Sequence, residues 1–420
     1  MPQLIVKKKS IVHYLLIYLL IISQGSVLYN VNQDAFIVLV LLTSLYFFIF
    51  KRIKLEREFG LFISGLFVCL VCVSFFTDGS LSIASVLNVC SRFLLAYIAY
   101  NYDSGGFARR FVQMVTILAL ISLVMYTVQM INFDIIRSIL PETSDTHQTF
   151  YGGFLFTATD YPHSKKNIGL ATEPGRYQIY LIAALYICMY RNIMLNFSQK
   201  KIRNCFVILL ITLITTQSTT GYISLMILIV GFLVRNLQKE KSSLSKSINR
   251  TMIAMIVVLI AYLFIAGDNN LLQKNLLNKL FDTNGNFDLS ASTGASRVGS
   301  ILTDLQIALK HPLGLGFEKY QALWRTSKIG NFLDVASCSG VTISLAALGF
   351  PATILILVFY LRNAARNLPS HLERIVLILI LINLSLSQPS FYYAPMIVCF
   401  MIRNNKGRSA EIVKTYKPYT

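Results

Sequence analysis

The stretch "EPGRYQIYLIAALYICMY", Glu173 to Tyr190, opens with residues typical of a helix start and continues as a long apolar run. Pro174 suits the first helical position, where its missing N–H is not needed, and Glu173 or Thr172 then caps the helix. Arg176 falls in the first turn, at the positive end of the helix dipole, where a cation is electrostatically disfavoured. The stretch therefore predicts an apolar helix with either an ion pair or an anion-binding site at its amino terminus.

The rest of the chain has the composition of a membrane protein. Of its 420 residues, 55% are hydrophobic and only 14% are charged, and the mean hydropathy is +0.60. Soluble domains carry roughly 25% charged residues. A helix needs roughly 20 apolar residues to cross a bilayer, and we find twelve runs near that length: about 11–28, 35–50, 60–76, 83–100, 111–131, 169–190, 204–217, 221–234, 251–266, 338–361, 375–387 and 390–402. We therefore expect an all-α polytopic membrane protein with 11 or 12 spans, because the broken last pair is either two spans or one re-entrant segment.

The net charge of +19 follows the predicted spans rather than forming a nucleic-acid patch. Most lysines and arginines lie in alternate connections, at Lys7–Lys9 and Arg403–Lys417 among others, while the short connections between them carry none. This is the positive-inside pattern, and it predicts that both termini are cytoplasmic. We expect a membrane lipid environment and no nucleic-acid partner.

Two long connections interrupt the hairpins and divide the chain. Loops much longer than about 15 residues are usually functional or disordered. The expected organisation is listed by residue number: 1–131, transmembrane helices 1–5; 132–168, outer loop A; 169–266, helices 6–9; 267–337, outer loop B; 338–402, helices 10–12; and 403–420, a basic cytoplasmic tail.

Loop B contains a second predicted helix, in "SRVGSILTDLQIALKHPLGLGFEKY". Its apolar residues, Val298, Ile301, Leu302, Leu305, Ile307 and Leu309, roughly follow helical spacing. The helix should begin near "SASTGAS" and end by His311–Pro312, followed by a tight "PLGLG" turn. We expect it to rest on the outer face of the bundle with its apolar side down.

Three arginines are candidate site residues. Arg176 at a helix amino terminus makes a bidentate phosphate site, or it pairs with Glu173 at i, i+3. Arg297 begins the loop B helix and is either a second anion-binding group or a solvated charge. Arg92 lies near the middle of the fourth predicted span, where a charge costs at least about 3 kcal/mol, so it is functional or buried against a polar partner such as Asn88.

Fewer groups are candidate bases or substrate contacts. His163, Lys165 and Lys166 cluster in "YPHSKKN" just before the Arg176 helix, and those lysines break the positive-inside pattern, which indicates a nearby anion. His311 follows the loop B helix. The hydroxyl-rich "TTQSTTGYIS", Thr215 to Ser224, serves either a hairpin turn or a sugar. Nucleotide-binding and metal-binding motifs are absent from the sequence, so we expect no cofactor and no metal.

The segments "EPGRYQ", "TQSTTGYISL" and "SRVGSILTDLQIALKHPLGLGF" resemble those of bacterial O-antigen polymerases (Wzy-type), within the O-antigen ligase and polymerase superfamily. The resemblance covers roughly residues 165–355. It implies a metal-independent glycosyltransferase of the bacterial inner membrane, with its active face in the periplasm. The partners it implies are undecaprenyl-diphosphate-linked glycan donor and acceptor, and a chain-length regulator protein.

By this resemblance Arg176 and Arg297 hold the lipid diphosphate. We assign Glu173 to catalysis with them, and Arg92, His163, Lys165, Lys166, Tyr177 and His311 to substrate binding. Ligases of the superfamily often carry a histidine where the late loop re-enters the membrane. This sequence instead reads "ASCSGVTISLAALGFP", with Cys338 and Ser339 near that place, which favours a polymerase over a ligase and leaves the base unassigned.

Two other functions are compatible with the sequence. An O-antigen ligase, or a polymerase for another surface polysaccharide, belongs to the same class. A flippase for lipid-linked oligosaccharides belongs to another class. Flippases and secondary transporters tend to show repeated halves and short loops, whereas this chain has no visible repeat and a loop of about 70 residues.

Overall fold

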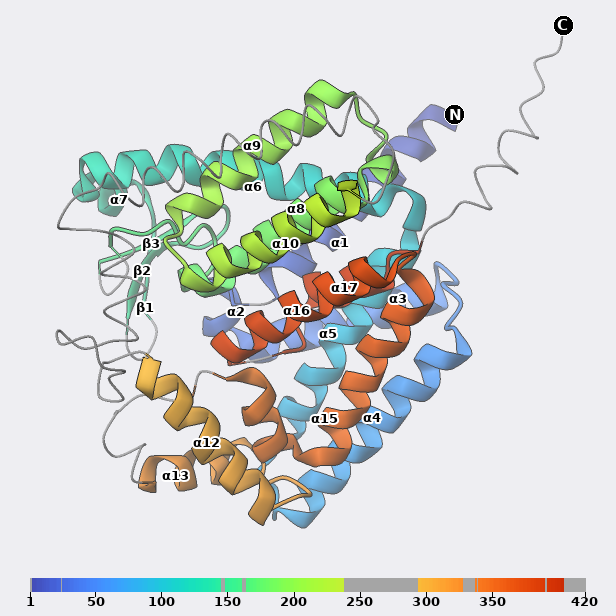
Figure 1. The fold of residues 1–420 in the computed structure, drawn as a ribbon, viewed down its shortest axis with the longest axis vertical. Coiled ribbons are helices and arrows are strands. Elements are labelled where there is room, and N and C mark those ends of the chain that lie inside the picture. The colour runs from blue at the N-terminus through green and yellow to red at the C-terminus, as the bar shows by residue number, and fades with distance from the viewer. Residues whose placement is uncertain are drawn as a thin grey trace, which may run out of the picture.

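The computed structural model describes residues 2–23, 25–144, 148–160, 164–237, 294–327, 337, 339–389 and 391–403. These residues are mostly helical, and they form one bundle with a small sheet at its edge (Figure 1). The helices are α1 (Pro2–Ile22), α2 (Val27–Val31), α3 (Gln33–Ile49), α4 (Arg57–Phe76), α5 (Ile83–Tyr102), α6 (Ser104–Ile131), α7 (Phe133–Ile139), α8 (Pro174–Tyr190), a 3-10 turn η1 (Asn192–Leu195), α9 (Gln199–Thr215), α10 (Thr219–Leu237), α12 (Gly294–Lys310), α13 (Phe317–Thr326), α15 (Gly340–Asn367), α16 (His371–Ser387) and α17 (Ala394–Met401).

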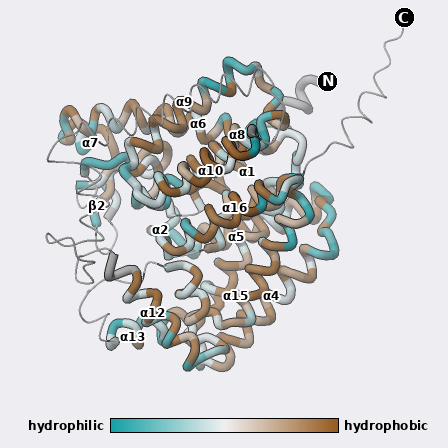
Figure 2. Tube along the Cα trace, in the orientation of Figure 1, coloured by the Kyte–Doolittle hydropathy of each residue, from teal (hydrophilic) through white to brown (hydrophobic). Residues whose placement is uncertain are grey.

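Five of these helices are long and apolar enough to cross a membrane: α4, α5, α6, α10 and α15. Shorter apolar helices cover Ser10–Ile22 and Gln33–Ile49. Figure 2 shows hydrophobic residues along α4 and α15 and hydrophilic residues around α7 and β2. The chain therefore belongs to the class of helical membrane proteins. Helices lie in eleven of the twelve segments predicted as spans, and the twelfth, 251–266, lies outside the described residues.

Helix α8 is the centre of the bundle. Every residue from Tyr177 to Tyr190 is buried, and α6, α9, α10 and α17 pack around the helix. A helix that is apolar on all sides must be enclosed in this way. We use its two ends as landmarks, and call them the Arg176 end and the Arg191 end of the bundle.

Helices α16 and α17 run in opposite directions, which separates the last pair of predicted spans into two helices. Glu373, at the start of α16, pairs with Arg191, while Gln388, just after its end, lies against Gly175 at the start of α8. Helix α17 then returns, and its Phe400 carbonyl accepts a 2.9 Å hydrogen bond from Asn367, the last residue of α15. All eight residues of α17 are buried, which explains its short, purely apolar sequence.

The first predicted span, 11–28, ends earlier than expected. Helix α1 stops at Ile22, and a separate short helix, α2, begins at Val27. Ser26 caps α2 by accepting a hydrogen bond from the Tyr29 amide, and Gly25 adopts φ +82°, a conformation that breaks a helix. The sequence prediction extended the span through this break, although the polar residues Ser23 to Ser26 interrupt the apolar run.

Loop A contains structure that the all-α prediction did not include. Strands β1 (Glu142–Ser144), β2 (Thr149–Gly152) and β3 (Thr157–Thr159) form an antiparallel sheet in the order β1-β2-β3. Tyr151 and Phe156 pack with Ile136 of α7 and with the last turns of α6. The sheet is thus attached to the bundle through a small apolar cluster of its own.

Helix α12 has the predicted bounds but not the predicted orientation. Val298, Leu302 and Leu309 are exposed, and the buried stripe consists of Ser300, Thr303, Asp304 and Ala308. The prediction of an apolar side facing the bundle is therefore wrong for half of the apolar residues. Small and hydroxyl side chains let α12 approach α15 closely, and α15 is its main neighbour.

Asp304 explains why the buried stripe of α12 is polar. Its carboxylate accepts hydrogen bonds from Tyr320 (2.6 Å), Ser337 (2.6 Å) and Thr342 (2.7 Å). Burial raises the pKa of Asp304, and these three hydroxyl donors oppose that effect. The contacts tie α12 to α13 and to the start of α15.

The "PLGLG" turn docks into a kink of α15. Leu315 and Gly316 donate backbone hydrogen bonds to Ala346 (3.0 Å) and Ala347 (2.9 Å), and Phe350 donates to Pro312 (2.9 Å). Within α15, Gly349 has φ +82° and lies against the Leu313 backbone. The kink and the turn therefore depend on each other.

We expect Gly349→Ala to destabilise the protein. The substitution forces a side chain into the left-handed region, which costs about 1–3 kcal/mol, and its Cβ overlaps the Leu313 carbonyl. Gly105→Ala is the matched control, since Gly105 has open space around it and no positive φ. The measurement is the midpoint of thermal unfolding in detergent. Equal midpoints for the two variants would contradict the docking described here.

Candidate functional site

The amino terminus of α8 has the local structure that its sequence predicts. Glu173 occupies the N-cap position and Pro174 begins the helix, but the Glu173 side chain makes no capping hydrogen bond. Its Oε1 instead pairs with Arg176 Nε at 2.8 Å, as the i, i+3 spacing allows. The Arg176 and Glu173 side chains keep 24% and 35% of their surface exposed, so a ligand can reach both.

Gly25 makes room for the Arg176 side chain. A Cβ at this position would overlap Arg176 Cδ, so a larger residue would displace the arginine side chain. The Gly25 carbonyl accepts hydrogen bonds from the Thr172 amide (2.9 Å) and hydroxyl (3.3 Å), and Ser26 forms an isolated β-bridge with Ala171. The break between α1 and α2 thus positions the guanidinium.

Arg92 brings a second guanidinium to the same region. It lies in the middle of α5 and donates hydrogen bonds to Asn88 Oδ1 (3.3 Å) and to the Tyr29 hydroxyl (3.2 Å). The rings of Tyr29 and Tyr392 lie 5.6 Å and 5.1 Å from its Cζ, within cation–π range. Asn88 was named as a polar partner of Arg92 from the sequence, and the structure confirms that contact.

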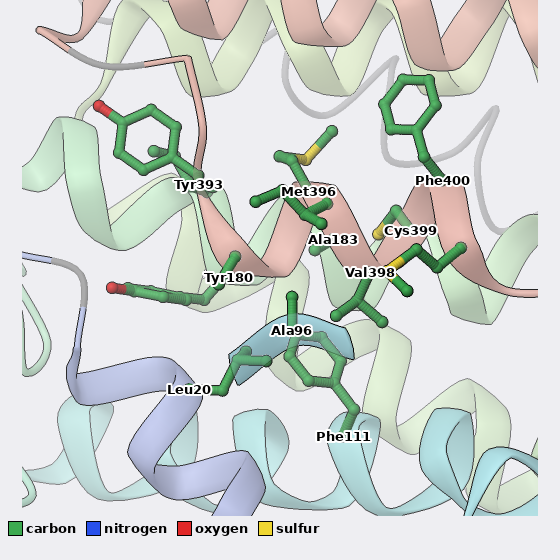
Figure 3. Close-up of a cluster of buried hydrophobic side chains, with 14 of the residues drawn as sticks. Leu20, Ala96, Phe111, Tyr180, Ala183, Tyr393, Met396, Val398, Cys399 and Phe400 are labelled. Carbon is green, nitrogen blue, oxygen red and sulfur yellow. The ribbon is translucent and has the colours of Figure 1, made fainter. Parts of the chain in front are cut away.

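Two buried tyrosines, Tyr180 and Tyr393, lie within electrostatic range of both arginines, Arg176 and Arg92. Figure 3 shows those two hydroxyls pointing to the same side, away from Met396, Val398 and Phe400. Within the described part of the chain, the buried Tyr393 hydroxyl has no hydrogen-bond partner. The cluster of Arg176, Glu173, Arg92 and Tyr393 is called the Arg176 site below.

The opposite end of α8 carries a second arginine–glutamate pair with different surroundings. Arg191 Nε lies 2.8 Å from Glu373 Oε1, and the two side chains are only 3% and 1% exposed. Tyr186 also donates to Glu373 (2.7 Å), and Arg191 donates to the Asn367 carbonyl (3.2 Å). The Arg191–Glu373 ion pair is buried inside the protein, whereas the Arg176–Glu173 ion pair is partly exposed.

Arg297 and His311, two further predicted site residues, lie at opposite ends of α12. Arg297 is in the first turn of that helix, and its side chain lies outside the described residues. Figure 1 places the amino-terminal end of α12 on the side of the bundle that carries the β-sheet. His311 is exposed just after the other end of α12, roughly 20 Å away by helical rise. Arg297 and His311 are therefore not brought together.

The lysines of "YPHSKKN" differ in environment. Lys165 is exposed, and its carbonyl accepts hydrogen bonds from Tyr126 (3.1 Å) and Gln217 (3.2 Å). Lys166 is half-buried, and burial lowers its pKa. His163 lies outside the described residues. The described segment is thus held against the ends of α6 and α9 by its backbone.

Tyr177 lies inside the bundle. It is 1% exposed, its hydroxyl hydrogen-bonds with Ser122 at 2.9 Å, and Asn167 donates to the same Ser122 oxygen at 3.2 Å. Gly169 lies directly against the Tyr177 ring. These contacts give Tyr177 a packing role between α6 and α8.

The hydroxyls of "TTQSTTGYIS" serve the turn between α9 and α10. Thr215 and Thr216 donate to the carbonyls of Thr212 and Leu213, both at 2.7 Å. Ser218 accepts from the Gly221 amide at 3.4 Å. Of the two readings of this segment, the described contacts favour the turn.

Sequence reasoning missed Gly25, Tyr29 and Tyr393 as parts of the Arg176 site. Each is more than 100 residues from Arg176 or lies in a span assigned only to packing. The one local signal is the "QGS" break before α2, which interrupts an otherwise apolar run. A glycine and a serine there predict a helix end.

No family model matches this chain, and no curated protein is significantly similar to it. Among the described residues, no group of three or more histidine, cysteine, aspartate or glutamate side chains is placed to hold a metal ion.

The lowered pKa of Lys166 is testable by competitive amine labelling. Because burial disfavours the charged form, the folded protein should reach half-maximal labelling of Lys166 at a lower pH than the urea-denatured chain. Mass spectrometry of the labelled peptide measures both midpoints, and the denatured chain is the control. An equal or higher midpoint in the folded protein would contradict the described burial.

Proposed function

We propose that this protein is a membrane glycosyltransferase that polymerises undecaprenyl-diphosphate-linked oligosaccharide repeat units into O-antigen. In this proposal the chain spans the bacterial inner membrane about twelve times, both termini are cytoplasmic, and the Arg176 end faces the periplasm. Donor and acceptor glycans are both carried on the lipid diphosphate, and a chain-length regulator protein is a further proposed partner. The resemblance of residues 165–355 to Wzy-type polymerases motivates the assignment.

One observation supports the site most strongly: the two arginine–glutamate pairs of α8 differ in accessibility. Arg191 is buried with Glu373, as a purely structural pair would be, but Arg176 remains partly exposed and interacts electrostatically with Tyr393, as does a second guanidinium, Arg92. A guanidinium is the preferred side chain for bidentate phosphate recognition. The amino terminus of α8 adds its own partial positive charge.

The proposed chemistry is displacement at the donor sugar. The acceptor hydroxyl oxygen forms a bond to the anomeric carbon, and the bond from that carbon to the diphosphate oxygen breaks. The diphosphate leaves with the bonding electrons, and the hydroxyl proton passes to a base. Arg176, with Arg297 from α12, stabilises the charge that develops on the diphosphate, and Arg92 contributes from α5.

Glu173 is the carboxylate proposed to accept the hydroxyl proton. It lies at the mouth of α8 and is 35% exposed, so an acceptor sugar can approach it. Its Oε1 is already paired with Arg176, so binding of a diphosphate by that arginine would release the carboxylate. Lys165, Lys166, His163 and His311 remain proposed contacts to the glycans.

Ligase activity is the second candidate in the same class, and a flippase is the candidate of another class. A lipopolysaccharide gel of a deletion strain separates the three. Loss of a polymerase leaves core bearing a single repeat unit, whereas loss of a ligase or a flippase leaves bare core. A deletion strain with bare core would contradict the proposed polymerase.

We expect Arg176→Ala and Arg297→Ala each to reduce long-chain O-antigen at least about 100-fold, since removing one preorganised donor typically costs that much. The readout is the gel ladder of a complemented deletion strain, normalised to protein level in the membrane. Arg137→Ala is the matched control, because Arg137 is an exposed arginine of α7 that pairs with Asp134 and Asp160. Normal ladders from both test variants would contradict the proposed role.

A second variant tests the position of Arg176 without removing it. Gly25→Ala should shorten or abolish the ladder, because its Cβ occupies the place of Arg176 Cδ. Gly79→Ala is the control for backbone strain, since Gly79 has a similar φ (+79°) and open space around it. If Gly25→Ala and Gly79→Ala shorten the ladder equally, backbone strain alone explains the loss. That result would contradict the positioning role of Gly25.

A further inference from the structure

A cavity of about 460 Å³ lies at the Arg191 end of the bundle, far from the Arg176 site along α17. It is enclosed by the start of α4, the end of α5, the end of α15 and the segment after α17. Neither the sequence motifs nor the proposed polymerisation uses it.

The charged lining of the cavity has a surplus of arginine. Four arginines and two glutamates face it: Arg57, Arg362, Arg366, Arg403, Glu56 and Glu58. Glu58 is shared by Arg366 (2.7 Å) and Arg362 (3.3 Å), and Glu56 is shared by Arg403 (2.5 Å) and Arg366 (3.9 Å). Each carboxylate is therefore used by two guanidiniums, which leaves net positive charge.

Two donors remain for a further anion. Within the described residues, Arg57 makes no ion pair, and the buried Nε of Arg403 has no hydrogen-bond partner. The amino terminus of α4 also begins at Arg57, so the helix dipole adds to the positive potential there. The arrangement suits a phosphate group, which arginines bind in a bidentate manner.

The other wall of the cavity is apolar and opens toward the outer surface of the bundle. Leu61 of α4 and Val358 of α15 line the cavity and are 66% and 48% exposed. Both belong to helices long and apolar enough to cross a membrane. An arginine-rich rim beside an exposed apolar wall matches a phospholipid, with its phosphate at the helix ends and its acyl chain along the helices.

We propose that this cavity binds the phosphate headgroup of an anionic phospholipid. Basic pockets between membrane helices on the cytoplasmic side bind such headgroups in other proteins, and the positive-inside pattern predicts that this end is cytoplasmic. The lipid bridges α4, α15 and the segment after α17, which arginine–glutamate pairs also join at this end of the bundle. This site is independent of the proposed glycosyltransferase activity.

Native mass spectrometry of the full-length protein in detergent tests the proposal. The probes are dioleoylphosphatidylglycerol, dioleoylphosphatidylcholine and inorganic phosphate. We expect the first bound phosphatidylglycerol to bind at least about tenfold more tightly than phosphatidylcholine, and R362Q/R366Q to remove that preference, since each basic residue contributes measurably to anionic-lipid binding. Millimolar inorganic phosphate should not displace the bound lipid.

The control removes the same number of charges elsewhere. K200Q/R203Q changes two exposed basic residues at the start of α9, and its lipid preference should stay within about twofold of the unmodified protein. Arg57→Gln is a second test variant that breaks no ion pair among the described residues, and it should weaken the preference even if R362Q/R366Q does not fold.

Three results would overturn the proposal. They are equal binding of the two lipids, an unchanged preference in the folded R362Q/R366Q and Arg57→Gln variants, and full displacement of the lipid by inorganic phosphate. The last result would assign the cavity to a soluble anion.

Discussion

The structure depends on the complete burial of α8, with an arginine–glutamate pair at each of its ends. A helix enclosed on all sides has no exposed face on which to place charge, so its ends are the positions where charged groups can meet solvent or ligand. At one end Arg191 and Glu373 neutralise each other inside protein, where loss of either partner would leave an unpaired buried charge. At the other end Arg176 and Glu173 remain accessible. The difference in accessibility, rather than the presence of charge, distinguishes a candidate site from a structural pair.

The short helix α17 links the two ends. Tyr393 precedes it at the Arg176 site, and Arg403 follows it beside the arginine-rich cavity. Helix α17 packs on α5 and α8, so a shift of α17 along its axis would move Tyr393 relative to both Arg92 and Arg176. The ion pair between Arg403 and Glu56 resists that shift from the far end of α17. The proposed catalytic groups are therefore held in place by contacts at both ends of the bundle.

Much of the helical framework could be predicted from the sequence, because long apolar runs have few alternatives in a membrane. The start of α8 at Pro174 and the bounds of α12 follow directly from capping residues and turn signals. The polar stretch around Gly25 marks a helix end, but the contact of Gly25 with Arg176 could not be predicted, since it depends on tertiary packing. The buried face of α12 was assigned wrongly because apolar residues were expected to face the bundle, whereas Asp304 finds three hydroxyl donors there. The convergence of Arg92 with Arg176 depends on tertiary packing, which no local pattern encodes.

A structure determined by electron microscopy with a bound, non-reactive undecaprenyl diphosphate analogue is the most direct test of the central claim. We predict density for the diphosphate within hydrogen-bond distance of the Arg176 guanidinium, on the side where Arg92 and the Tyr393 hydroxyl converge, and a loosened contact between Arg176 and Glu173. Diphosphate density elsewhere in the protein, with the Arg176–Glu173 pair undisturbed, would contradict the account.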